Sequence, residues 1–261
     1  MTEGGTVALR PRHEHGWRAG VSTLMSAGFG SWWRTKEWWT QALLWTVVIN
    51  GSVAVAVWGD APDGLDVFTL FGVMTMFAAI AVAILMQEEI VGEKRSGTAA
   101  WVLSKPVSRE AFMLSKLVPN AVGVLATMIA IPSAFLLLQT TLAGIEASVP
   151  RFALGALVAG LNLMFYLTLT LMLGTLFDSA GPVIAIPLAF AFGQQLIAGI
   201  PGLGSVLPWA LVVTSAGSDT SVTGAVITGQ LVTAPGAVVV TAAACGVFTV
   251  VAFWKWNRTE L

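Results

Sequence analysis

Six long apolar segments dominate the pattern of hydrophobic and polar positions along the chain, and none of them carries a charged side chain. They are 41–58, 67–86, 117–139, 152–177, 182–203 and 235–254. A helix rises about 1.5 Å per residue, so about 20 apolar residues cross the roughly 30 Å hydrocarbon core of a bilayer. Strands of a β-barrel would instead alternate over segments of about ten residues. The pattern therefore predicts an all-α polytopic membrane protein with six transmembrane helices.

The composition agrees with this prediction and excludes several classes of protein. Of the 261 residues, 56% are hydrophobic and only 10% are charged, whereas soluble globular chains carry about 25% charged residues. The mean hydropathy is +0.81, and so few polar residues could not coat a soluble core. We therefore expect no soluble enzyme, no disordered protein and no nucleic-acid-binding protein. The first apolar segment begins at Gln41, too deep for a secretory signal peptide, so we expect the N-terminus to be retained.

Basic residues indicate how the six segments are oriented. Lysine and arginine collect in the cytoplasmic loops of membrane proteins. All but one of the 13 basic residues lie before the first segment, between the second and third, or after the last, and the exception is Arg151. This distribution predicts a multi-pass protein of the cell membrane with both termini in the cytoplasm. Tryptophans favour the membrane interface, and five stand at predicted span ends: Trp38, Trp39, Trp58, Trp254 and Trp256.

The predicted organisation has three parts along the chain. They are the N-terminal region 1–40, the membrane domain 41–256 and the cytoplasmic tail 257–261. Within the first part, residues 21–39 combine tryptophans with Arg34 and Lys36, which is typical of a helix lying in the cytoplasmic interface. Gly28 and Gly30 weaken that helix prediction, because glycine lowers helix stability. We still expect an interfacial helix that leads into the first span.

An outward-facing insertion, residues 204–234, separates the fifth and sixth spans. It holds an apolar run at 206–213, which is too short to cross the bilayer, followed by a stretch rich in serine, threonine and glycine. Irregular backbone at membrane depth must be buried in protein or line a cavity. We therefore expect a short re-entrant or interfacial segment before the sixth span.

The sequence contains no catalytic constellation. It has no GxxxxGK[ST] phosphate loop, and its only histidines, His13 and His15, lie in the polar N-terminus. With a single cysteine, no disulfide, metal site or nucleophilic dyad is expected. An EExxxR protease motif is incomplete, because position 93 is Glu93. Charge-free spans also disfavour a channel and a proton-driven transporter. If the protein transports a substrate against a gradient, we therefore expect the energy for transport to be supplied from outside the bilayer.

The loop between the second and third spans is the most informative segment. It covers 87–116 and reads QEEIVGEKRSGTAAWVLSKPVSREAFMLSK. The sequence predicts a helical extension of the second span that breaks at Gly97, and a short helix at 98–103. Pro106 then imposes an extended turn, and Ser108 caps the helix of the third span.

Two functions of this loop are compatible with its composition. Trp101 and Leu103 are apolar in a polar loop, and exposed anchors of this kind are typical of interface cores. They favour a docking surface for a soluble partner. The alternative is a solvated loop that only fixes the topology, as charge runs usually do.

The motif Glu88-x-x-x-GEKRSGT, followed by LSKPVSR and a lysine before the third span, resembles the membrane subunit of ABC type-2 exporters. The six spans, the N-terminal interfacial helix and the insertion before the sixth span fit that family as well. The resemblance covers the loop residue by residue at the following positions: Glu88, Glu89, Glu93, Lys94, Arg95, Gly97, Thr98, Ser104, Pro106, Ser108 and Arg109.

The resemblance implies a permease that forms a homodimer and pairs with two copies of a separate nucleotide-binding ATPase subunit. That subunit would bind ATP and Mg, so no cofactor is expected in this chain and the chain itself is not expected to be an enzyme. The loop would be the element that couples ATP hydrolysis to the spans. Together with the apolar anchor Trp101, the expected coupling residues are Glu88, Glu89, Glu93, Lys94, Arg95, Gly97 and Thr98.

A few polar side chains in the spans are candidates for a transport pathway. They are Asn50, Asn162, Tyr166, Gln194 and Gln195. The alternative role is packing between helices through hydrogen bonds, which is common in membrane bundles. Because so little charge is available, the expected cargo is apolar or amphipathic. A non-transporting scaffold, which recruits a cytoplasmic protein through the charged loop, is the alternative to the exporter.

Overall fold

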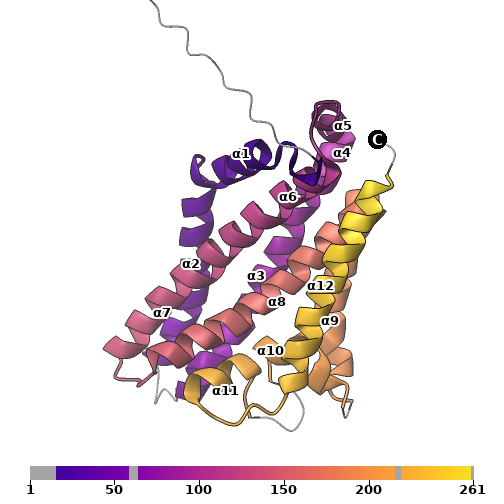
Figure 1. Cartoon of the computed structure of the whole chain (residues 1–261). Helices are drawn as coiled ribbons and strands as arrows, with labels where there is room; N and C mark the ends of the chain where they lie inside the picture. Colours follow the sequence, from indigo (N-terminus) through magenta and orange to yellow (C-terminus); the bar gives the residue numbers. More distant parts are fainter. Residues whose placement is uncertain (1–15, 59–63, 201, 215–218, 260–261) are drawn as a thin grey trace, which may run out of the picture.

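A computed structural model describes residues 16–58, 64–200, 202–214 and 219–259, and in these ranges the chain is helical with no strand (Figure 1). Six candidate membrane-spanning helices are present, which confirms the predicted all-α, multi-pass architecture. They are α2 (Glu37–Val57), α3 (Gly64–Gln87), α6 with α7 (Arg109–Val124 and Ile131–Leu142), α8 (Val149–Leu176), α9 (Ala180–Ile197) and α12 (Pro235–Asn257). We call the end of the bundle that carries residues 88–108 the loop end, and the opposite end the insertion end.

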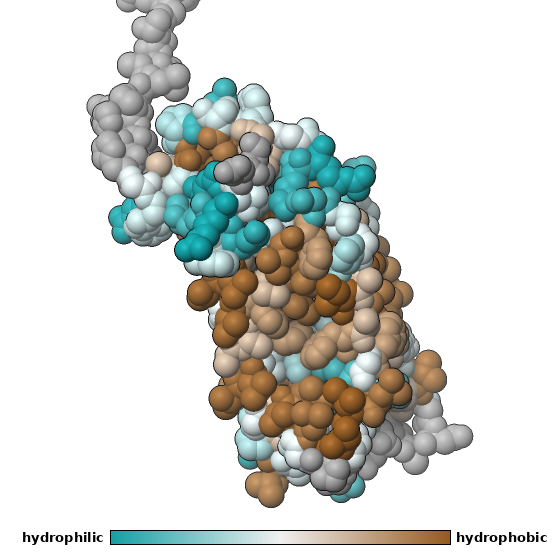
Figure 2. All heavy atoms as spheres, turned by 90° about the vertical axis from the view of Figure 1, so that its right-hand side faces the viewer, coloured by the Kyte–Doolittle hydropathy of each residue, from teal (hydrophilic) through white to brown (hydrophobic). Residues whose placement is uncertain are grey.

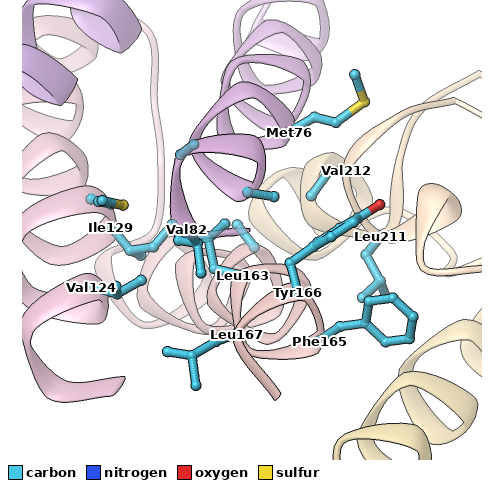
Figure 3. Close-up of a cluster of buried hydrophobic side chains, with 14 of the residues drawn as sticks. Met76, Val82, Val124, Ile129, Leu163, Phe165, Tyr166, Leu167, Leu211 and Val212 are labelled. Carbon is cyan, nitrogen blue, oxygen red and sulfur yellow. The ribbon is translucent and has the colours of Figure 1, made fainter. Parts of the chain in front are cut away.

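Helix α8 forms the centre of the bundle and contacts α3, α9, α12 and the insertion helix α11 (Val222–Thr228). Lipid tails are as apolar as leucine, so packing rather than hydrophobic burial holds such helices together. Figure 3 shows Leu163, Phe165 and Tyr166 of α8 packed between Val82 of α3 and Leu211 of the insertion. The central helix α8 therefore connects α3 with the insertion.

Two spans contain π-helical turns that the sequence did not predict. η2 (Glu88–Gly92) continues α3 without a break into α4 (Glu93–Ser96), and η3 (Leu125–Ala130) joins α6 to α7. A π-helical turn inserts an extra residue into the helix, shifts the faces beyond it and often marks a functional site. Here η2 coincides with the acidic part of the loop motif.

The N-terminal helix is shorter than predicted. α1 (Val21–Trp33) ends at Trp33, and α2 begins at Glu37, so Trp38 and Trp39 belong to the first span and not to the interfacial helix. Figure 1 shows α1 crossing the loop end at a steep angle to α2. Glycine lowers helix stability, but Gly28 also has a packing role. Its missing side chain lets α1 lie close to α6. A Cβ at Gly28 would lie 2.8 Å from the Pro119 ring and from the Ser115 carbonyl oxygen.

The described part of the insertion, 204–214 and 219–234, contains three short helices: η4 (Gly204–Val206), α10 (Trp209–Val212) and α11 (Val222–Thr228). None of them is long enough to cross a bilayer, as predicted. All four residues of α10 are buried, against α3 and α8. The fifth span ends at Ile197, six residues before its predicted end, because Gly199 and Gly202 follow and do not favour a helix.

Candidate functional site

The acidic residues of the loop motif lie on the helical extension of α3, as predicted, and two of them form ion pairs with α6. Lys116 Nζ lies 2.9 Å from Glu89 Oε2 and also pairs with Glu93. Glu89 and Glu93 are four residues apart and therefore share a helix face. The Lys116 side chain is only 15% exposed. These contacts hold the extension of the second span against the start of the third.

Lys94 makes a different connection, to the end of α8. Its Nζ lies 2.8 Å from Asp178 Oδ1 and donates to the carbonyl oxygens of Phe177 and Thr175 at 3.3 Å and 3.5 Å. The last carbonyls of a helix lack partners within the helix, and a cation stabilises them. The hydrogen bond and the charge of Lys94 lower the pKa of the Asp178 carboxyl. Lys94 therefore ties the loop to the central helix, and its side chain is not presented at the surface.

Arg109 makes an equivalent connection to α12. Its guanidinium donates to the Trp256 carbonyl oxygen at 2.9 Å, in the last turn of α12. The Phe112 ring stacks on the Trp256 ring, with centroids 5.0 Å apart. Ser108 caps α6, as predicted, by accepting a hydrogen bond from the Ala111 backbone N–H at 2.9 Å. The start of α6, where the loop enters the third span, is thus fixed to the sixth span.

The tip of the loop is the short helix α5 (Thr98–Leu103), which begins where the sequence predicted. Gly97 has a φ of +75°, in the left-handed region that favours glycine, and it separates α5 from α4. Trp101 is 65% exposed on α5, and Lys105 Nζ lies 5.0 Å from its ring centroid. Arg95 and Thr98 are exposed as well. We call Arg95, Thr98, Trp101 and Lys105 the tip surface.

Beside the tip, a pocket of about 560 Å³ lies between α1, the η2–α4 extension and α6. It is lined by Glu88, Glu89 and Glu93 with Lys116, so the acidic side chains outnumber the basic one. Glu88 is exposed, and within the described part of the chain only the Gln87 amide donates to its carboxylate, at 3.3 Å. No group of histidine, cysteine or acidic residues in the described ranges could hold a metal ion, while His13 and His15 lie outside those ranges.

The candidate pathway residues do not converge on one cavity. Gln194 Nε2 donates to the Tyr166 hydroxyl at 2.9 Å, and Gln194 Oε1 accepts from the Trp209 backbone N–H at 3.0 Å. All three residues are buried, so this connection fastens the insertion to α8 and α9. These bonds favour the packing role for Tyr166 and Gln194.

The remaining candidates lie in three other places. Asn50 Nδ2 donates to the Pro132 carbonyl oxygen at 3.1 Å, which joins α2 to α7. Asn162 is buried in α8, and its Nδ2 has no hydrogen-bond partner among the described residues. Gln195 is exposed on the outer face of α9. The five residues therefore do not outline a pathway within a single chain.

Sequence reasoning missed the role of Lys116 and the helix-capping role of Lys94 and Arg109. The sequence did contain one signal for the role of Lys94. Asp178 directly follows a long apolar segment, and an acidic residue in that position indicates a basic partner nearby. The pairing itself joins residues more than 80 positions apart, so the sequence alone could not assign it.

The comparisons with known proteins identify a family without assigning an activity. A family model described as "Protein of unknown function (DUF2705)" matches residues 48–261, which include the second half of the first span, the loop and all later spans. None of the curated proteins matches the chain. Since the matched region covers most of the sequence, the chain belongs to the DUF2705 family of proteins of unknown function.

Proposed function

We propose that this chain is the membrane subunit of an ATP-driven exporter of the ABC type-2 kind, with the loop end in the cytoplasm. In this proposal the tip surface docks on a separate nucleotide-binding subunit, and two such subunits serve a homodimer of this chain. The resemblance of the loop motif and the lack of a phosphate loop in the sequence support a separate ATPase. An apolar or amphipathic cargo of the cell membrane suits spans without charged side chains.

One observation carries this proposal: the loop that bears the exposed Trp101 is bound to the ends of three spans. Trp101 is mostly exposed on α5, while the flanking residues Lys94, Lys116 and Arg109 hold the loop to α8, α6 and α12. A partner that moves the tip would therefore move the ends of these helices as well. Interfaces and packed helices respond to such shifts by switching between discrete arrangements.

The scaffold alternative uses the same surface in a different way. A protein that only recruits a partner needs an exposed anchor such as Trp101, but it does not need the loop to be tied to the ends of α8 and α12. The ties made by Lys94 and Arg109 favour the exporter, because they connect the docking surface to the part of the chain that would have to change shape.

Purification of the full chain from its native membranes tests the proposal. We expect an ATP-hydrolysing protein with a phosphate loop to co-purify with a tagged chain in a 1:1 ratio, since each of two loops would bind one subunit. As a control, the same preparation from cells with an untagged chain should contain no ATPase activity. A purified chain accompanied by a protein without a nucleotide site would favour the scaffold and contradict the exporter.

A further inference from the structure

A pocket opens on the side of the bundle between η3, α7 and the first turns of α8, and we call it the α7–α8 pocket. Its volume of about 470 Å³ lies within the range of about 300–1,000 Å³ for sites that bind small molecules. Ile129, Phe152 and Ala156 in its lining are buried, whereas Val149 and Leu157 at its edge are 62% and 66% exposed. Apolar side chains cover most of the surface between the two ends of the bundle on the face that Figure 2 shows, as expected for a bundle surrounded by lipid. The pocket is therefore open to the hydrocarbon core of the membrane.

Small side chains leave this space between two spans that lie close together elsewhere. At Gly160 of α8, a Cβ would lie 2.8 Å from Leu125 Cδ2, so α8 lies against the start of η3 at that level. Nearer the insertion end the lining includes Ala130 and Ala153, whose methyl groups do not fill the gap. The π-helical turn η3 forms part of the wall, and such turns often mark functional sites.

Ser133 of α7 contributes the one polar side chain to the lining of this pocket. The residue is 5% exposed, and its hydroxyl makes no hydrogen bond to the described residues. A serine or threonine inside a helix commonly bonds to a carbonyl oxygen one turn earlier. The other serines and threonines of the third span do so, namely Ser115, Thr127, Thr140 and Thr141. The Ser133 hydroxyl is thus left without a partner in a buried, apolar position, which costs free energy.

The depth of Ser133 in the bundle limits which molecule can pair with it. Ser133 lies nine residues before Leu142, the end of α7, which corresponds to about 14 Å at about 1.5 Å per residue. This is near the middle of a hydrocarbon core about 30 Å thick. A saturated phospholipid tail has no donor or acceptor at that depth. A buried water molecule needs two to four polar partners, and the lining offers one polar side chain.

We propose that the α7–α8 pocket binds an apolar molecule that carries a hydroxyl or carbonyl group, with that group hydrogen-bonded to Ser133 Oγ. A serine hydroxyl both donates and accepts, so it pairs with either group. The apolar lining takes up the rest of the molecule, since ligand pockets are mostly apolar with a few polar groups that fix orientation. Binding of this molecule does not require an ATPase, so the site goes beyond the proposed function and is tested independently of it.

Photolabelling of the full chain in phosphatidylcholine nanodiscs tests this site. The probe is a long alkyl chain with one mid-chain hydroxyl and a terminal diazirine, and the matched probe is the same chain without the hydroxyl. We expect the hydroxylated probe to label α7 and α8 at a half-saturating concentration roughly 3- to 20-fold lower than that of the hydrocarbon probe. Equal half-saturating concentrations would overturn the proposal, because the pocket would then hold no more than a lipid tail.

Variants of the lining separate the role of the hydroxyl from that of the space. Ser133→Ala should raise the half-saturating concentration of the hydroxylated probe to that of the hydrocarbon probe. The matched control Ser52→Ala should leave it unchanged, because the Ser52 hydroxyl already donates to the Val48 carbonyl oxygen at 2.7 Å. Ala153→Phe should prevent labelling by both probes, and its exposed position leaves room for the larger ring. Undiminished labelling by the hydroxylated probe in Ser133→Ala or in Ala153→Phe would overturn the assignment.

Discussion

Glu93→Lys is expected to abolish the coupling of ATP hydrolysis to the membrane subunit without preventing membrane insertion. The change removes one of the two carboxylates that pair with Lys116 and places a second cation beside it. Loss of one partner of a partly buried ion pair costs about 1.5–5 kcal/mol, and about 1.4 kcal/mol corresponds to a factor of ten. We therefore expect ATP hydrolysis that responds to cargo to fall tenfold or more in a reconstituted complex. Insertion should persist because the changed residue lies beyond the apolar part of the second span.

The charge-swapped double variant Glu93→Lys/Lys116→Glu is the matched control for this prediction. It restores one opposite-charge pair between α4 and α6 with the same total charge but places the new carboxylate at position 116 beside Glu89, so it should recover the coupling only in part. Wild-type coupling in the single variant would show that the loop is only a solvated anchor of topology. A double variant no better than the single one would show that the pair between positions 93 and 116 does not carry the coupling.

Trp101→Ala is expected to have the second large effect, on the affinity for the nucleotide-binding subunit. Trp101 is the large apolar side chain of the tip surface, and truncation of a tryptophan at the centre of an interface typically costs about 2–4 kcal/mol. That range corresponds to roughly 30- to 1000-fold weaker binding. The dissociation constant of the purified chain and ATPase, measured in detergent or nanodiscs, checks this prediction.

Trp17→Ala is the control for that measurement. Trp17 lies at the same end of the bundle, is 55% exposed and contacts the neighbouring Arg18 side chain. Since it lies outside α5, its removal should leave the affinity unchanged. Equal losses for both tryptophans would mean that general apolar adhesion, and not docking of the tip surface, explains the binding.

The number and type of the spans could be predicted because length and apolarity are properties of each segment alone. The break at Gly97, the helix at 98–103 and the cap at Ser108 were also predictable and are confirmed, since each depends on local backbone chemistry. The π-helical turns and the end of α1 at Trp33 were not predictable. They depend on how neighbouring helices pack, as the close approach of Gly28 to Pro119 shows.

The candidate site shows the same division between local and long-range causes. The motif residues were recognisable, but the contacts of Lys94 with Phe177 and of Arg109 with Trp256 join distant segments. The two glutamines of α9 show the limit most clearly. Consecutive helical residues point about 100° apart, so Gln194 is buried while Gln195 is exposed. Composition alone cannot tell which of the two faces the bundle.

Photocrosslinking from position 101 tests the central claim most directly. A benzophenone side chain introduced at Trp101 in the full chain should, on irradiation of native membranes, attach to a protein that contains a phosphate loop and hydrolyses ATP. The same group at position 17 should not capture that protein. Capture of a protein without a nucleotide site, or capture of the ATPase from position 17 but not from position 101, would contradict the account.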